Sequence, residues 1–177
     1  MDRRIIGYSL SLACLAGVAL TGRAQADVKA AAPDGFVIQM KGETPLGREA
    51  AWTRLADVAS WWSGAHTYSG DAKSLSVDVV AGGCWCELWA DGEVEHGRVV
   101  QVLRGSVLRF DTALGPLQGL GVVGVMTFTL KDGAAPDTTA IVLDYRVSGS
   151  SQSGLDQMAV PVDQVLSEQF KRLISPD

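Results

Sequence analysis

The sequence is 177 residues long and its formal net charge is −5. An acidic chain lacks the basic surface that nucleic acids and anionic membranes attract, so we expect neither as a partner. The length suits one domain with a substantial core, and no repeat or long linker divides it.

Residues 1–26 have the pattern of a secretory signal peptide. Arg3 and Arg4 precede an apolar run that is too short to span a bilayer, and the small-residue site Ala24-Gln25-Ala26 follows it. We therefore expect an exported mature chain, periplasmic or secreted, with no membrane span. The paired arginines match a twin-arginine signal only loosely, so both export routes stay open. Residues 27–34 are expected to form a flexible lead-in.

A strand and a helical segment open the domain. Apolar residues recur at every second position over 36–41, which predicts a half-buried strand. Thr44 offers an N-cap and Pro45 a first helical residue, so a helix is expected to run from there to about Ala56. A second short helical turn is expected over 58–62.

The middle of the chain has the period of two that is typical of strands. Six further strands are expected, at 73–80, 84–90, 93–103, 106–112, 122–131 and 138–147. Tight turns are expected at Asp91-Gly92 and Arg104-Gly105. Together with the first strand they predict a seven-stranded antiparallel meander.

The C-terminal segment returns to helical spacing, with an apolar stripe from Leu155 to Leu173. Pro161 is unfavourable inside a helix, so either the main helix starts near Val160 or the segment is kinked there. The concave face of the sheet is the large surface left to receive the stripe, which predicts an α+β fold.

This order of elements resembles the helix-grip fold of the START-related SRPBCC superfamily over residues 35–174. Trp61-Trp62, the segment 82–87 and the segment 162–173 resemble the branch that includes heat-shock ATPase activator homologues and polyketide cyclase/dehydrase-like proteins. The resemblance implies a seven-stranded curved antiparallel sheet wrapped around a long C-terminal helix, with two short helices after the first strand. It also implies a cavity that holds a small hydrophobic molecule, and it carries over no catalytic residue.

Glu87 and His96 are the strongest candidates for chemistry. A turn at Asp91-Gly92 would pair them directly across a hairpin, on one face of the sheet. A histidine and a carboxylate in one pocket can act as an acid–base pair, and the alternative is a charge pair that orders the sheet. His66, in the loop 63–70, is the remaining catalytic candidate.

The same register predicts which face of the hairpin lines the cavity. Trp85 and Arg98 would share the face of Glu87 and His96, and aromatic walls with a few polar groups suit a ligand pocket. In the alternative, Trp85 stacks on Arg98 at the solvent side. The segment 115–121 is interpreted as an apolar flap or as a connection whose leucines pack beneath it. The expected ligand-binding residues are Trp85, Glu87, His96, Arg98, Trp62, His66, Leu117, Val162, Leu166 and Phe170.

Cys84 and Cys86 are expected to be buried free thiols. Two residues apart on an extended strand means about 6.6 Å between Cα atoms, with the Cβ atoms too far apart for a disulfide. Zinc would need further ligands from a small pool of histidines and carboxylates. We expect no metal and no cofactor.

Three functions fit these features. The leading hypothesis is an exported binding protein that holds a small, mostly apolar molecule. The first alternative is an enzyme on the same scaffold, a lyase, cyclase or hydrolase that uses His96 or His66 with Glu87. The second alternative is a protein-binding module, which only the resemblance to heat-shock activators suggests. The ligand and the oligomeric state stay open.

Overall fold

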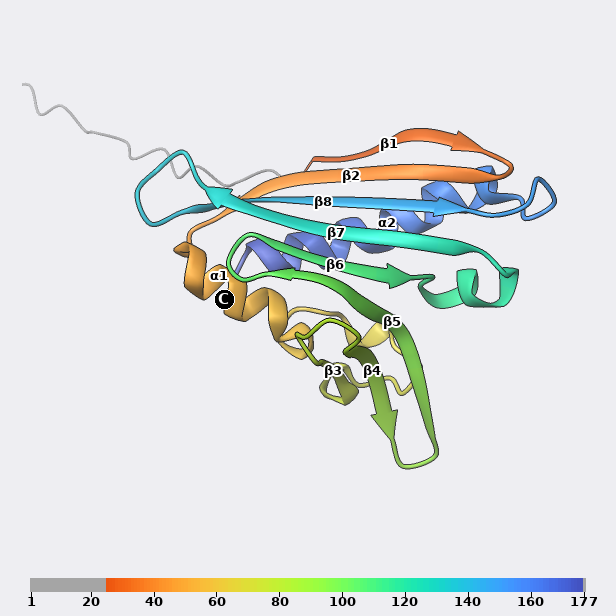
Figure 1. The fold of residues 1–177 in the computed structure, drawn as a ribbon, viewed down its shortest axis with the longest axis horizontal. Coiled ribbons are helices and arrows are strands. Elements are labelled where there is room, and N and C mark those ends of the chain that lie inside the picture. The colour runs from red at the N-terminus through yellow and green to blue at the C-terminus, as the bar shows by residue number, and fades with distance from the viewer. Residues whose placement is uncertain (1–24, 177) are drawn as a thin grey trace, which may run out of the picture.

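The computed structural model describes residues 25–176. Within these residues, eight strands form one antiparallel sheet in the order β1-β2-β8-β7-β6-β5-β4-β3, and the long helix α2 (Leu155–Ile174) lies along one face of it (Figure 1). The expected α+β class is confirmed, and the arrangement is consistent with a helix-grip fold. The α2 helix and the concave face of the sheet thus enclose the core.

The strands are close to those expected, with one addition. They are β1 (Gln25–Ala32), β2 (Gly35–Thr44), β3 (Leu75–Val77), β4 (Cys84–Trp89), β5 (Gly92–Leu103), β6 (Val107–Thr112), β7 (Val123–Asp132) and β8 (Thr139–Ser148). The prediction of seven strands is therefore wrong, because it omits β1. This strand pairs with β2 through a tight turn between Ala32 and Gly35.

The segment 27–34 is mostly strand and not a flexible lead-in. The alternation of polar and apolar residues here, from Gln25 to Ala30, crosses the expected cleavage site and ends in a run of alanines, which have low strand propensity. Residues 1–24 of the expected signal peptide lie outside the described residues. Since β1 begins at Gln25, cleavage after Ala26 would leave most of this strand in the mature chain.

The early helical region begins later than expected. Strand β2 continues to Thr44, which is buried and pairs with Thr139 of β8, so Thr44 is not an N-cap. The helix α1 (Arg48–Ala56) follows with Gly47 at its N-cap. Three 3₁₀ turns come next, η1 (Val58–Ser60), η2 (Gly64–His66) and η3 (Ala72–Ser74), and a fourth, η4 (Gly115–Leu120), joins β6 to β7.

The helix α2 is continuous from Leu155, with Pro161 inside it. Because proline has no backbone N–H, α2 lacks the hydrogen bond that residue 161 would otherwise donate to the carbonyl of Gln157. The C-terminal half packs tightly: a Cβ atom on Gly42 of β2 would lie 2.6 Å from Cδ1 of Ile174. The N-terminal half leaves the space described below. Among residues 25–176, no helix has both the length and the hydropathy needed to cross a bilayer.

Candidate ligand-binding site

The hairpin between β4 and β5 has a different register from the one expected. Its turn is Ala90-Asp91, with Trp89 paired to Gly92, and Glu87 faces Val94 instead of His96. Farther along, Cys86 pairs with Glu95 but Trp85 pairs with Gly97, so His96 is one extra residue on β5. This is a β-bulge, a feature that re-aims side chains and bends strands.

The bulge brings His96 to Glu87 despite the changed register. Nε2 of His96 lies 2.9 Å from Oε2 of Glu87, and the two side chains are 8% and 0% exposed. The hydroxyl of Thr112 donates to the carbonyl of His96 at 2.7 Å, which holds the bulge against β6. A Cβ atom on Gly97 would lie 2.7 Å from Cβ of Thr112, so only glycine fits beside the bulge. The expected contact is present, but the bulge produces it.

Backbone groups hold the Glu87 carboxylate on its other side. The N–H groups of Tyr68 and Ser69 both donate to it, the former at 3.1 Å. Burial by itself raises the pKa of Glu87, but the hydrogen bonds from Ser69, Tyr68 and His96 outweigh it and hold the pKa below its ordinary value. Glu87 is therefore an anion that fixes both the loop and the imidazole.

Aromatic rings surround the imidazole. The ring of Tyr68 lies 5.8 Å from that of His96, and the buried ring of Trp85 lies 6.0 Å from it on centroid distances. Trp85 also contacts Trp62 at 5.2 Å and Phe110 at 5.3 Å. These contacts leave His96 little freedom to turn, so its ring atoms have fixed directions.

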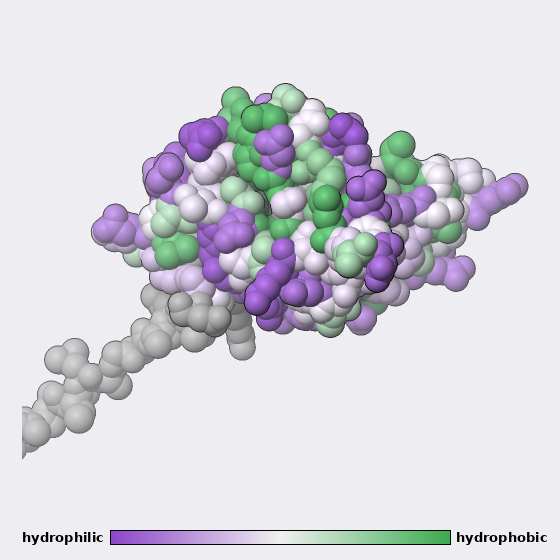
Figure 2. All heavy atoms as spheres, turned by 90° about the horizontal axis from the view of Figure 1, so that it is seen from below, coloured by the Kyte–Doolittle hydropathy of each residue, from purple (hydrophilic) through white to green (hydrophobic). Residues whose placement is uncertain are grey.

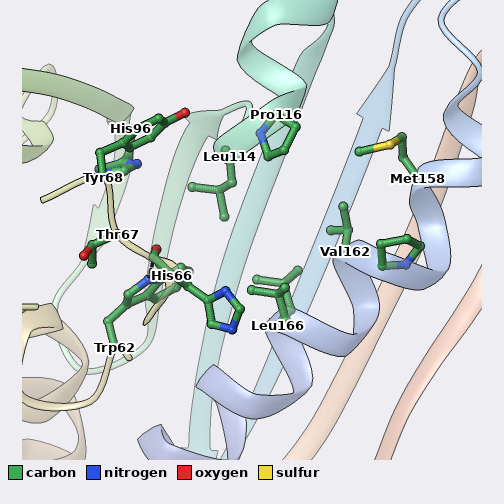
Figure 3. Close-up of a pocket in the computed structure, with 13 residues that line it drawn as sticks. Trp62, His66, Thr67, Tyr68, His96, Leu114, Pro116, Met158, Val162 and Leu166 are labelled. Atoms are coloured by element: carbon green, nitrogen blue, oxygen red, sulfur yellow. Dashed lines mark hydrogen bonds between the residues drawn. The ribbon is translucent and has the colours of Figure 1, made fainter. Parts of the chain in front are cut away.

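A cavity of about 490 Å³ lies between this aromatic group and the N-terminal half of α2. Figure 3 shows Met158, Val162 and Leu166 on one side, opposite His96 and Tyr68. The lining is mostly apolar and consists of Trp62, His66, Thr67, Tyr68, His96, Leu114, Gly115, Pro116, Met158, Pro161, Val162, Val165 and Leu166. The volume is in the range of small-molecule sites. Figure 2 shows the molecule from below relative to Figure 1, and on this face apolar residues gather between polar ones.

The loop that contains η2 is attached to α2. Nε2 of His66 lies 3.3 Å from Oε2 of Glu168, and the N–H of Ser63 donates to Oε1 of Gln169 at 2.7 Å. The indole of Trp62 donates to the carbonyl of His66 at 3.0 Å. The loop thus forms one wall of the cavity and is held both by the helix and by Glu87.

Another wall of the cavity depends on Tyr145 of β8. Its hydroxyl donates to the carbonyl of Thr112 at 3.1 Å and accepts from the N–H of Leu114 at 3.3 Å. Burial raises the pKa of Tyr145, so this hydroxyl keeps its proton. Tyr145 thereby fixes the start of η4, which supplies Gly115 and Pro116 to the lining.

The ten expected ligand-binding residues are divided between three places. Trp62, His66, His96, Val162 and Leu166 line the cavity. Trp85 and Glu87 form the layer directly behind His96 and do not line it.

The other three lie away from the cavity lining. Leu117 is fully buried beneath η4, in agreement with the structural interpretation of that segment, and Phe170 lies near Gly42 toward the far end of α2. Arg98 is on the outer face, where it pairs with Glu95 and does not stack on Trp85. Its predicted position is wrong because the bulge at His96 reverses the alternation of faces.

Sequence reasoning missed several lining residues. Met158 and Val165 lie one turn from Val162 on α2, and Pro161 lies one turn from both of them, so helical spacing could have found them. Thr67 and Tyr68 come from an irregular loop, and Leu114 and Pro116 from a connection, where no periodicity predicts direction.

The cysteine prediction is wrong. Cys84 and Cys86 form a disulfide on the outer face of β4, with Cα atoms 5.4 Å apart. The strand is less extended here than an ideal one, opposite the bulge in β5, and the shorter Cα separation falls within the range that disulfides need. Among the residues that the structure describes, no three histidine, cysteine, aspartate or glutamate side chains gather as a metal site.

Comparisons with known proteins report fold likeness alone. No family model matches the sequence, and no curated protein matches it. Several solved structures do match this chain. EF2215 of Enterococcus faecalis, a conserved protein of unknown function, matches with a TM-score of 0.59 at 12% identity. The match covers 86% of this chain and 75% of EF2215. MLL2253 of Mesorhizobium loti gives 0.55 at 16% identity, with 77% and 93% covered. CalU16 of Micromonospora echinospora gives 0.51 at 11% identity, with 86% of each chain covered.

Proposed function

We propose that this chain is an exported SRPBCC-type helix-grip protein that binds a small, mostly apolar molecule between α2 and the sheet. The observation that carries the proposal is the cavity of about 490 Å³ with its mostly apolar lining. A concave and mostly apolar pocket of this volume with a few polar groups is typical of small-molecule sites. A purely protein-binding role gives no reason for it.

The buried hydrogen bond between His96 and Glu87 supports the same proposal. His96 lines the cavity and the Glu87 carboxylate lies behind it, so the site combines mostly apolar walls with an imidazole whose direction is fixed. Such a combination binds apolar molecules by burial and orients them by a hydrogen bond.

The proposal is tested by filling the cavity. Val162 lines it, whereas Val160 on the same helix is exposed, so Val162→Trp should block the space and Val160→Trp is the matched control. The probe is N-phenyl-1-naphthylamine, a neutral molecule whose fluorescence rises in apolar surroundings. Wild type and Val160→Trp should bind it with similar affinity, and Val162→Trp at least tenfold more weakly. Equal binding by all three proteins would contradict the proposal.

A second candidate is an enzyme on the same scaffold, and the buried pair of His96 and Glu87 favours it. A carboxylate that orients an imidazole toward a bound molecule is a general-base arrangement. Once the natural ligand is identified, its turnover by wild type, lost in His96→Ala with binding retained, would support catalysis. A ligand recovered unchanged would support binding alone.

A further inference from the structure

The proton on His96 can be assigned from the partners of Glu87. The carboxylate faces two backbone N–H groups, from Tyr68 and Ser69, and these groups can only donate. The lowered pKa of Glu87 agrees with an anion that accepts from all its neighbours. Nε2 of His96, which faces the same carboxylate at 2.9 Å, must therefore carry a hydrogen and donate it.

The other imidazole nitrogen is available to a ligand. Within the described residues Nδ1 of His96 makes no hydrogen bond, and it is absent from the buried atoms that lack a partner, so it is not sealed inside the core. His96 lines the cavity, and the rings of Tyr68 and Trp85 restrict its rotation. In neutral imidazole this nitrogen is an acceptor with a lone pair.

The other residues that line the cavity limit which chemical group of a ligand could pair with Nδ1 of His96. No lysine or arginine is among the lining residues, so a carboxylate or phosphate on the ligand would have no permanent cation beside it. The hydroxyl of Thr67 already donates to the carbonyl of Gly64 at 2.8 Å, which leaves it a poor donor for a ligand carbonyl. The hydroxyl of Tyr68 donates to Oε1 of Gln118 at 3.5 Å, and Nε2 of His66 faces Glu168. Nδ1 of His96 is therefore the unused acceptor at this end of the cavity, and its complement is a neutral donor.

From these contacts we infer that the bound molecule is a hydroxylated apolar compound whose O–H donates to Nδ1 of His96. This inference rests on the proposed function and specifies its ligand class. The bound O–H completes a chain in which the ligand donates to the imidazole and the imidazole donates to Glu87. A phenol suits the site well, because Tyr68 presents aromatic surface beside His96 and Trp62 also lines the cavity.

The test compares two probes that differ in one donor. 2-Naphthol carries the hydroxyl and 2-methoxynaphthalene has it capped by a methyl group, and both are measured by displacement of N-phenyl-1-naphthylamine. Wild type should bind 2-naphthol about five- to tenfold more tightly, the value of one buried hydrogen bond. His96→Phe, which keeps a ring of similar size, should bring the ratio close to one. His66→Phe should shift both affinities in the same direction and leave their ratio unchanged.

A spectroscopic measurement keeps the inference testable if His96→Phe does not fold. The sequence contains two histidines, His66 and His96, so ¹⁵N-histidine labelling gives the ring-nitrogen signals of two imidazoles, which His66→Phe assigns. In its neutral form, the His96 imidazole should carry its hydrogen on Nε2, and 2-naphthol should shift its Nδ1 resonance. The opposite tautomer, equal affinity for the two probes, or tighter binding of 2-naphthoate than of 2-naphthol would overturn the inference and leave the binding function intact. Absence of binding by every probe would overturn both.

Discussion

Replacing Glu87 by glutamine changes little in volume but removes a buried charge that three donors share. Glu87 is 0% exposed and accepts from Tyr68, Ser69 and His96. Each hydrogen bond to a charged acceptor contributes about 1.5–3 kcal/mol, and an unsatisfied buried donor costs about 1–3 kcal/mol. The amide of glutamine keeps one acceptor oxygen but turns its NH₂ group toward at least one of the three donors. We therefore expect Glu87→Gln to lower the free energy of unfolding by about 2–4 kcal/mol.

The pH dependence of this loss tests the reasoning separately. Because the folded-state pKa of Glu87 lies below its ordinary value of 4.5, its contribution is fully present above that pH and is lost as the pH falls through the folded-state pKa. The difference in unfolding free energy between wild type and Glu87→Gln should therefore shrink on acidification below pH 4.5. The other carboxylates are common to both proteins and largely cancel.

Urea denaturation followed by tryptophan fluorescence measures both quantities. Glu95→Gln is the matched control, because Glu95 lies on the same hairpin but pairs with Arg98 at the surface, where a salt bridge contributes about 0–1 kcal/mol. A loss for Glu87→Gln no larger than that for Glu95→Gln, or a difference that does not change with pH, would refute the description of Glu87 as a buried anion.

Three further predictions concern the bulge, the disulfide and the leader. Gly97→Ala should destabilise the protein by about 1–3 kcal/mol in the same urea assay, because its Cβ would lie 2.7 Å from that of Thr112, and an unchanged midpoint would contradict the bulge geometry. Thiol counting on denatured, unreduced mature protein should find no free thiol at Cys84 or Cys86, and replacing both by serine should cost at most about 2 kcal/mol because the closed loop is so short. The intact mass of the exported product should correspond to cleavage after Ala26, and a mass that retains the leader would contradict the signal-peptide prediction.

The sheet was largely predictable because its strands carry an alternating pattern with one buried face. Inward residues such as Leu108 and Phe110 recur at every second position, and the stripe of α2 has the spacing that a helix needs. Strand β1 escaped prediction because its short alternation crosses the expected cleavage site after Ala26 and ends in alanines, which have low strand propensity. The register of the β4–β5 hairpin failed because Asp91-Gly92 resembles a turn, whereas the chain turns one residue earlier.

The candidate site was predictable only in part, for a related reason. The contact between Glu87 and His96 was expected. The bulge that produces it depends on the fit of Gly97 against Thr112, and spacing along one strand does not reveal a contact between strands. The same bulge turned Arg98 outward. Tyr68 lines the cavity from an irregular loop whose backbone direction is set by Glu87, so its role follows from tertiary structure alone.

Native mass spectrometry of the protein purified without added ligand tests the central claim, a cavity that holds a small apolar molecule, most directly. We expect a species heavier than the polypeptide by the mass of one small molecule, which organic solvent extracts. This species should persist in Val160→Trp, where the substitution is on the surface, and should be absent from Val162→Trp, where it fills the cavity. The claim would be contradicted if the wild type showed the mass of the polypeptide alone and this mass did not change after incubation with N-phenyl-1-naphthylamine.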